Sequence, residues 1–313
     1  MVRAFVYPGQ GSQAVGMGQE LAAAFPVARA VFDEVDEALG EDLSGLIFAG
    51  DIETLTLTEN AQPALMAVSL AATRAIEQAT ERSLADLAGY VAGHSLGEYS
   101  ALAAAGALSV ADAARLLRRR GRAMQKAVPV GQGAMAALLG LDIDVARTVA
   151  EAASGDAVCV AANDNAPGQV VVSGHKAAVE RALALAAEQG ARRCVLLPVS
   201  APFHCPLMQP AAEEMAAALA EVEVARPRVP LVANVTATAV DDPQEIRRLL
   251  VAQVTGAVRW RESVLFMAGA GVDTLVEVGA GKVLAGLARR IDKALAASAV
   301  GTPAEVEAFA ATL

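Results

Sequence analysis

The chain has 313 residues, a length that suits one α/β domain carrying an insertion. Hydrophobic residues make up 55% of it, and many of them are alanine, which favours helices packed closely on a sheet. The formal charge of −10 excludes a global basic field that would attract nucleic acid, so an acidic partner would need a local basic patch.

The three cysteines, Cys159, Cys194 and Cys205, form neither a CxxC pair nor a disulfide framework, which is typical of a reducing cytosol. The first residues run from a short apolar strand into a turn and lack the apolar region of a signal peptide. The longest uncharged stretch, residues 195–212, contains four prolines and is therefore not a spanning helix. We expect a cytoplasmic monomer that binds neither nucleic acid nor membrane.

Short apolar runs alternate with long helical patterns, which is typical of a largely parallel sheet with helices on both faces. The predicted strands are Ala4–Tyr7, Gly89–Ala92, Val229–Asn234 and Thr274–Val278. The predicted helices are Met17–Phe25, Ala61–Ala79, Leu96–Ala105, Val110–Ala127, Ala211–Ala220 and Val283–Ala294. We assign them to a large domain that resembles an α/β hydrolase and spans residues 1–128 and 199–313.

The pattern changes between residues 129 and 198. The predicted order there is strand, helix, strand, strand, helix and strand, over Ala134–Leu139, Asp144–Ala153, Val158–Ala162, Gln169–Ser173, Lys176–Gln189 and Arg193–Leu197. This is the ferredoxin-like order, and about 70 residues can form a small core of their own. We therefore predict a ferredoxin-like subdomain inserted into the large domain.

The segment Gly93–Gly97 carries the strongest chemical pattern. An apolar strand enters a GxSxG turn, and an alanine-rich helix leaves it. Glycines two residues either side of Ser95 remove the Cβ atoms that would clash in so sharp a bend. The bend presents the serine hydroxyl at the carboxyl end of the sheet, where the N–H of Leu96 can donate to an oxyanion. We predict that Ser95 is a nucleophile rather than part of a chance match.

A serine hydroxyl needs a neighbouring base to attack at neutral pH, and the chain offers three histidines. His94 adjoins Ser95, and neighbouring side chains diverge, so it is a poor base. His175 begins a predicted helix, where a solvated or capping role is the ordinary expectation. His204 follows an apolar strand, and a proline two residues away on each side can hold its imidazole in place. We favour His204 as the base over a purely structural histidine.

Two further features of the candidate site stay open. Cys205 is a rival nucleophile, but no turn presents its thiol, and we expect it to pack in the core. No acid between Ser95 and His204 stands out, because the acidic residues there fall mostly on helix surfaces or in the small subdomain. Either one of them is the hidden acid or a backbone carbonyl orients the histidine.

The predicted helix Val110–Ala127 carries six basic residues. At about 100° per residue, five of them form one solvent-facing stripe: Arg115, Arg118, Arg119, Arg122 and Lys126. Arg120 instead projects from the apolar face, where a guanidinium must find an anion or several carbonyls. It either forms an internal salt bridge or clamps a substrate carboxylate. The stripe is either a solvated face or a contact for phosphates or an acidic carrier protein.

Two glycine-containing loops, Pro8–Gln13 and Gly279–Lys282, follow predicted strands. Neither is a nucleotide-binding motif, because Ala14 replaces the third glycine of a dinucleotide fingerprint and Val283 the Ser/Thr of a P-loop. Both lie where open α/β sheets bind ligands, and the N–H of Gln10 is placed to complete an oxyanion hole. Metal-ligand spacing is absent, and we expect neither a metal nor a resident cofactor.

Six segments occur together in one order along the chain: PGQGSQ at 8–13, GHSLGEYSAL at 93–102, Arg120-Gly121, NAPGQVVVSG at 165–174, APFHC at 201–205 and EVGAGKVLAGL at 277–287. In these motifs and their order the chain strongly resembles, from end to end, the malonyl-CoA:acyl carrier protein transacylases of type II fatty acid synthesis. The middle residue of Gly279-Ala280-Gly281 is a small departure, since many relatives have proline there.

The resemblance implies a role for each candidate residue. Ser95 would carry the malonyl ester, His204 would act as base, and Arg120 would bind the free malonyl carboxylate. The N–H groups of Gln10 and Leu96 would form the oxyanion hole. The carbonyl that replaces the missing acid falls on Gln253, Asn165 lines the cleft from the small subdomain, and the ring of Phe203 leaves little room for a 2-methyl branch.

The resemblance implies malonyl-CoA and an acyl carrier protein as partners, and we expect a ping-pong reaction. Three alternatives stay open: a serine esterase or thioesterase, a carrier-protein-binding module without activity, and an acyltransferase that serves polyketide synthesis. Basic candidates for the surface that binds the carrier protein are Arg118, Arg119, Arg289, Arg290 and Lys293.

Overall fold

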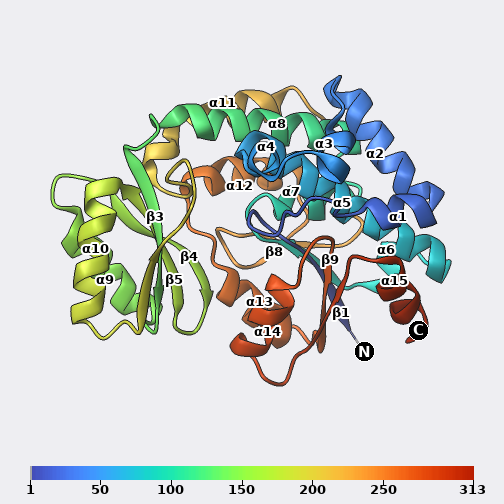
Figure 1. Cartoon of the computed structure of the whole chain (residues 1–313). Helices are drawn as coiled ribbons and strands as arrows, with labels where there is room; N and C mark the ends of the chain where they lie inside the picture. Colours follow the sequence, from blue (N-terminus) through green and yellow to red (C-terminus); the bar gives the residue numbers. More distant parts are fainter. Residues whose placement is uncertain (1) are drawn as a thin grey trace.

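The computed structural model describes residues 2–313 and contains two sheets (Figure 1). The strands of the large sheet are β1 (Arg3–Tyr7), β2 (Tyr90–Gly93), β7 (Leu231–Val232), β8 (Ala239–Val240), β9 (Thr274–Val278) and β10 (Ala296–Val300). The strands of the small sheet are β3 (Gly133–Leu139), β4 (Cys159–Ala166), β5 (Gln169–His175) and β6 (Arg193–Leu196).

Helices separate most of these strands. Those before the small sheet are α1 (Gln19–Ala24), α2 (Pro26–Leu39), α3 (Leu43–Ala49), α4 (Ile52–Thr56), α5 (Thr58–Thr80), α6 (Leu84–Leu87), α7 (Gly97–Ala104) and α8 (Val110–Ala127). The small sheet carries α9 (Ile143–Ser154) and α10 (Lys176–Glu188). After it follow a 3₁₀ turn (Pro206–Met208), α11 (Gln209–Ala220), α12 (Pro243–Thr255), α13 (Trp260–Gly269), α14 (Val283–Ile291) and α15 (Pro303–Ala310).

The large sheet has the strand order β10-β9-β1-β2-β7-β8. All of its pairs are parallel except β7 with β8. The predicted mixed α/β fold with a mostly parallel sheet is therefore confirmed. β1 lies at the middle of the sheet and is buried along Ala4–Tyr7, as expected where helices cover both faces. The carboxyl ends of β1 and β2 consequently lie side by side, which brings the two loops that follow them together.

The passage from β2 into α7 depends on two glycines. A Cβ atom on Gly93 would lie 1.9 Å from the carbonyl carbon of Gly97, and one on Gly97 would lie 2.3 Å from the carbonyl oxygen of Tyr7. Neither position accepts a side chain, so the strand can turn into the helix only with glycine at both. Ser95, between them, adopts a left-handed backbone with φ of 54°.

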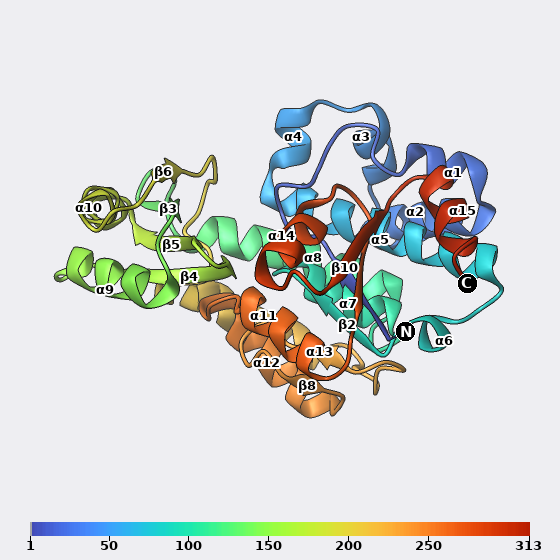
Figure 2. The same cartoon turned by 90° about the horizontal axis from the view of Figure 1, so that it is seen from below.

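The small sheet is antiparallel throughout, in the order β4-β5-β3-β6, and α9 and α10 cover one of its faces (Figures 1 and 2). Successive side chains of a strand point to opposite faces. Ala136 and Leu138 of β3 accordingly pack under the two helices, whereas Met135 belongs to the core of the large sheet. Val171 of β5 also belongs to the core of the large sheet. The uncovered face of the small sheet therefore looks toward the large sheet.

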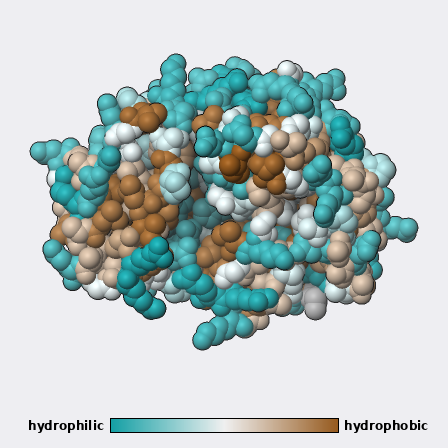
Figure 3. All heavy atoms as spheres, viewed as in Figure 1, coloured by the Kyte–Doolittle hydropathy of each residue, from teal (hydrophilic) through white to brown (hydrophobic). Residues whose placement is uncertain are grey.

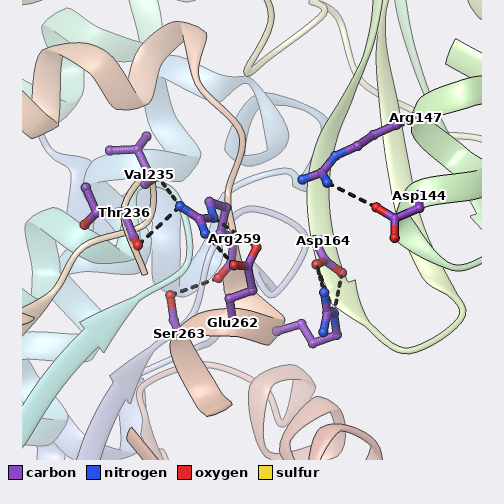
Figure 4. A network of polar contacts seen from close by, with 9 residues as sticks. Asp144, Arg147, Asp164, Val235, Thr236, Arg259, Glu262 and Ser263 are labelled. Carbon is purple, nitrogen blue, oxygen red and sulfur yellow. Dashed lines mark hydrogen bonds and ion pairs between the residues drawn. The ribbon is translucent and has the colours of Figure 1, made fainter. Parts of the chain in front are cut away.

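β4 joins the small sheet to the segment before α13. The N–H of Asp164 donates to the carbonyl of Val258 at 2.9 Å, and the N–H of Val258 donates to that of Ala162 at 2.8 Å. The Asp164 carboxylate is buried and forms an ion pair with Arg261 at 2.8 Å. Figure 4 shows Asp164 close to Arg259, which precedes α13, and to Glu262 of its first turn, and these two residues form their own ion pair. Backbone and charge together fix β4 against α13.

Several sequence-based boundaries need correction. The strand predicted over Val229–Asn234 is limited to Leu231–Val232, and the helix predicted over Ala61–Ala79 begins at Thr58. The elements that were not predicted are the helices α2, α3, α4, α6, α12, α13 and α15 and the two edge strands β8 and β10. No helix among residues 2–313 is both long enough and apolar enough to cross a membrane.

The placement of Arg118 on a solvent-facing stripe is wrong. Arg118 is only 5% exposed, because α2 and the first turn of α5 pack over this side of α8. Its guanidinium donates to the carboxylate of Glu41 at 2.6 Å and to the backbone carbonyl of Glu59 at 2.8 Å, and it also contacts Asn60. A helical pattern shows which residues share a face, but it does not show which segment covers that face.

Candidate active site

Ser95 and His204, which are 109 positions apart in the sequence, lie in contact. Ser95 Oγ lies 2.8 Å from His204 Nε2. The N–H of Ser95 donates to Asn234 Oδ1 at 2.8 Å, which holds the turn in its left-handed conformation. His204 stands in the loop that returns from β6 and has a left-handed backbone of its own, with φ of 58°. The structure thus brings together the two residues that the sequence singled out.

Backbone carbonyls orient the imidazole. His204 Nδ1 lies 2.9 Å from the carbonyl oxygen of Gln253 and 3.2 Å from that of Gly256. Because a carbonyl only accepts, Nδ1 carries the proton and Nε2 is left as the acceptor for the Ser95 hydroxyl. Burial, together with the nearby Arg120 charge, lowers the pKa of His204 to about 3, so the imidazole is neutral at physiological pH.

The guanidinium of Arg120 points into the same site. The residue is 1% exposed, and its Nη2 donates to Ser95 Oγ at 3.2 Å and to Gln253 Oε1 at 2.9 Å. Its Nη1 donates to Gln62 Oε1 at 2.7 Å. All three partners are neutral, and within residues 2–313 Arg120 forms no salt bridge. Of the two interpretations of Arg120, the internal salt bridge is therefore wrong.

A buried polar cluster lies behind the serine. The side-chain amide of Gln253 donates to Ser95 O at 2.9 Å and to Glu98 Oε2 at 2.8 Å. The same carboxylate oxygen accepts the N–H of Asn234 at 3.1 Å, and Asn234 Nδ2 donates to the Gly93 carbonyl at 2.7 Å. Burial raises the pKa of Glu98 to about 7. Glu98, Asn234 and Gln62 are site residues that the sequence analysis missed.

A cleft of about 300 Å³ opens over Ser95 between the two sheets. Gln253 does not line the cleft. The other candidate residues do: Gln10, Leu96, Arg120, Asn165, Phe203 and His204. Met135 and Val171 contribute from the uncovered face of the small sheet. Figure 3 shows the surface hollowed between the small sheet, at the left, and the rest of the molecule. An acyl group entering this cleft would reach serine, histidine and arginine together.

The remaining candidates lie apart from Ser95 Oγ. His94 Nε2 bonds to Asn165 Oδ1 at 2.8 Å, so its ring faces β4 rather than the serine hydroxyl. His175 Nδ1 accepts the N–H of Val158 at 3.0 Å, within the small sheet. Cys205 is buried and its thiol contacts the Pro202 carbonyl at 3.0 Å, which agrees with a packing role. Burial raises the pKa of this thiol, so it is a poor nucleophile.

Comparison with known proteins assigns the chain to a class. Residues 4–304 match the family model described as the acyl transferase domain. The chain is 48% identical to the malonyl CoA-acyl carrier protein transacylase of Escherichia coli, with 97% of each chain covered. It therefore belongs to the malonyl CoA-acyl carrier protein transacylases within the acyl transferases, as its sequence motifs predicted.

Solved structures agree. An acyl-carrier-protein S-malonyltransferase from Bartonella henselae is 55% identical, with a TM-score of 0.97 over 100% of this chain and 99% of that one. A malonyl-transacylase solved in complex with its type II PKS acyl-carrier protein is 41% identical, with a TM-score of 0.96 over 100% of both chains.

Proposed function

We propose that the chain transfers a malonyl group from malonyl-CoA to the phosphopantetheine thiol of acyl carrier protein, in two steps through an ester on Ser95. One observation carries the proposal: Ser95 Oγ lies 2.8 Å from the nitrogen of a neutral imidazole and 3.2 Å from a buried guanidinium that forms no ion pair among residues 2–313. A nucleophile, its base and a site for the second carboxylate of malonyl therefore converge on one point.

In the first step, Ser95 Oγ attacks the thioester carbonyl while His204 Nε2 takes the hydroxyl proton. The Gln253 carbonyl, 2.9 Å from Nδ1, stabilises the imidazolium that forms. The N–H groups of Leu96 and Gln10 receive the negative oxygen of the tetrahedral intermediate. The carbon–sulfur bond then breaks, and the proton on His204 passes to the departing coenzyme A thiolate.

The second step runs the same chemistry in reverse with a new thiol. His204 Nε2 takes the proton of the phosphopantetheine thiol, whose sulfur attacks the malonyl-serine ester. When the carbon–oxygen bond breaks, the imidazolium returns the proton to Ser95 Oγ. No metal or resident cofactor takes part in either step of this proposal. Water must be kept from the ester between the steps, and the narrow cleft supports that.

Arg120 and Phe203 select the acyl group in this proposal. A buried cation without its carboxylate is costly, so an uncharged acyl group gains less from this site than malonyl does. The bidentate geometry of a guanidinium matches the free carboxylate of malonyl. Phe203 lines the cleft, and its ring restricts the space beside the acyl carbon to an unbranched group. Asn165, held by His94 at 2.8 Å, limits the cleft on the side of the small sheet.

We also propose the domain division suggested by the sequence. Residues 129–198 would be a ferredoxin-like subdomain, and residues 1–128 and 199–313 an α/β-hydrolase-like domain, although residue 1 lies outside the described residues. The strand order β4-β5-β3-β6 and the two helices on one face support the former. The turn at Ser95, between a parallel strand and a helix, supports the latter.

The remaining expectations keep the status of proposals. Action as a monomer is supported by the site, because one chain supplies nucleophile, base and arginine. A cytoplasmic location is supported by the three free cysteines. The acidic balance of the chain supports the absence of a nucleic-acid partner, and no membrane surface enters the proposed reaction. Service in fatty acid synthesis follows the type II transacylases that the sequence resembles. Service in polyketide synthesis stays a second candidate, because one similar structure holds a type II PKS carrier.

The test is the intact mass of the protein after mixing with malonyl-CoA, followed by a chase with holo acyl carrier protein. We expect a malonyl adduct that maps to Ser95 and then moves to the carrier. Ser95→Ala should take up no malonyl, whereas the matched variant Cys205→Ser should load normally. An adduct lost to water with the carrier unloaded would indicate an esterase or thioesterase. A native chain that takes up no malonyl would support a binding module without activity.

A further inference from the structure

Glu98 is a buried carboxylate that the proposed reaction does not use. It stands in the first turn of α7, three residues after the nucleophile, and is fully buried. Its Oε2 accepts two hydrogen bonds, from the Gln253 side chain and from the Asn234 backbone. Its Oε1 has no hydrogen-bond partner within residues 2–313. A fold rarely retains so poorly satisfied a carboxyl group, so its position requires a reason.

The Gln253 side chain connects this carboxylate to Arg120. Its amide oxygen accepts from Arg120 Nη2 at 2.9 Å, and its NH₂ donates to Glu98 Oε2 at 2.8 Å. A guanidinium only donates and an ionised carboxylate only accepts, so the two groups fix opposite ends of the amide. A reversed amide would place NH₂ against the guanidinium and oxygen against the carboxylate. Glu98, together with the Ser95 carbonyl that accepts from the same NH₂ at 2.9 Å, therefore allows a single orientation of Gln253.

That orientation controls where the guanidinium lies. Arg120 Nη2 donates both to Gln253 Oε1 and to Ser95 Oγ, so the amide oxygen keeps this nitrogen beside the nucleophile. The Arg120 Nη1 contact with Gln62 fixes the other arm of the fork. Without Glu98, the Gln253 NH₂ keeps the Ser95 carbonyl as its remaining close acceptor, so the amide can rotate more freely and hold the Arg120 Nη2 arm less firmly. Glu98 does not line the cleft. Its contact with Gln253 leads to the Arg120 guanidinium, whereas its contact with the Asn234 backbone leads to the turn at Ser95, which malonyl and acetyl share.

We propose that Glu98 is a positioning residue for acyl selection: by anchoring the Gln253 amide, its carboxylate directs the Arg120 guanidinium toward the malonyl carboxylate. The proposal rests on the proposed function and deepens the role of Arg120 within it. It requires Glu98 to affect binding of malonyl but not of acetyl, since acetyl has no carboxylate for Arg120 to receive.

The test measures KM and kcat for Ser95 loading from malonyl-CoA and from acetyl-CoA in Glu98→Leu and Glu98→Gln, at about pH 8, where the native carboxyl is ionised. Loss of the acceptor in Glu98→Leu should raise the malonyl KM about tenfold and change the acetyl KM by less than about twofold. Glu98→Gln keeps a weaker acceptor and should raise the malonyl KM about threefold.

Glu277 provides the matched control. It lies on β9, which β1 separates from β2, is also fully buried, accepts the N–H of Ala285 at 2.8 Å and does not line the cleft. Glu277→Leu and Glu277→Gln should leave the malonyl-to-acetyl ratio unchanged. A Glu98 variant that shows the same behaviour would overturn the proposal, and so would tighter malonyl binding, because Glu98 would then act only as a charge that repels the substrate.

The result stays decisive if Glu98→Leu does not fold. Glu98→Gln is nearly isosteric, and a native malonyl-to-acetyl ratio in that variant alone would reject the positioning role. Failure of the proposed function is distinguishable, because it would appear in the native chain as no malonyl loading at all. In that event this proposal, which depends on it, also fails.

Discussion

Arg118 and Arg120 stand two residues apart on α8, and both are buried, but their surroundings differ. Arg118 is covered by neighbouring segments and forms an ion pair with the carboxylate of Glu41 at 2.6 Å. Arg120 faces the cleft, and its hydrogen-bond acceptors within residues 2–313 are neutral oxygens of Gln62, Gln253 and Ser95. A buried cation that folding has already paired with a carboxylate serves stability, whereas one left without an anion keeps its affinity for a ligand.

Replacement of Arg120 should show most clearly that Arg120, and not Arg118, binds the acyl group. We expect Arg120→Ala to lower kcat/KM for malonyl transfer by about 100- to 1,000-fold, because a buried charge-assisted contact with the substrate carboxylate is lost. Acetyl transfer should be retained or improved. The measurement is kcat/KM for both thioesters, with Arg118→Ala as the matched control that keeps the native preference. An unchanged preference for malonyl in Arg120→Ala would reject the carboxylate clamp.

The charge state of Glu98 tests whether Arg120 has an ion-pair partner within the chain. Burial raises the folded pKa of Glu98 from its ordinary 4.5 to about 7, so the unfolded chain releases this proton first as pH rises. Native stability from this group is therefore full below 4.5 and is lost as pH rises through about 7. Relative to the native chain, Glu98→Gln should gain up to about 3 kcal/mol between these limits.

Urea unfolding of the native chain and Glu98→Gln at about pH 5 and pH 8 measures this difference. A pH-independent difference would show that the carboxyl titrates normally. If Glu98→Gln instead lost stability relative to the native chain as pH rose, Glu98 would be a paired counter-charge of Arg120. The contrast between the two arginines would then disappear.

Arg118→Ala should affect stability without affecting acyl selection. The variant removes hydrogen bonds to Glu41, Glu59 and Asn60 and leaves the carbonyl of Glu59 without this donor. We expect a loss of about 2 kcal/mol in the free energy of unfolding, since Glu41 is partly exposed and water recovers part of the contact. Thermal or urea unfolding checks the value. A loss of malonyl preference would place Arg118 in the site.

The smallest expected effect concerns His204. Its pKa of about 3 keeps the imidazole neutral, so the rate of Ser95 acylation from acetyl-CoA should hold from about pH 8 down to about pH 5. The Arg120 charge is the second cause of this low pKa, after burial. In Arg120→Ala the acid limb should therefore move to higher pH, whereas in Arg118→Ala it should not move. An ordinary limb near pH 6.5 in the native chain would contradict the neutral base.

Sequence patterns predicted those site residues that a short stretch of chain is enough to identify. Ser95 could be found from two glycines and a strand–turn–helix pattern, and Arg120 from its place on the apolar face of one helix. Glu98 and Asn234 could not, because each acts through a contact with a residue more than 100 positions away in the chain. Glu98 alone looks like an acidic residue in a first helical turn, which is where acidic residues are common on surfaces.

Some missed elements did carry signals. The helix α12 begins with Asp242, Pro243 and Glu245, and the Asp242 side chain accepts the N–H of Glu245, which is an N-terminal capping pattern visible in the sequence. The strand β10, by contrast, is Ala-Ala-Ser-Ala-Val at the sheet edge and offers no alternation of apolar and polar residues. Its pairing with β9 depends on the sheet that is already present.

The left-handed backbone conformations of Ser95 and His204 affect how evolution conserves the two residues. Each costs on the order of 1 kcal/mol for a residue other than glycine. Random substitution to glycine at either position would relieve that cost and abolish the serine–histidine pair. A lineage freed from the need for acyl transfer would therefore lose these residues while its fold became more stable. Selection for the reaction, acting against selection for stability, is what keeps both in place.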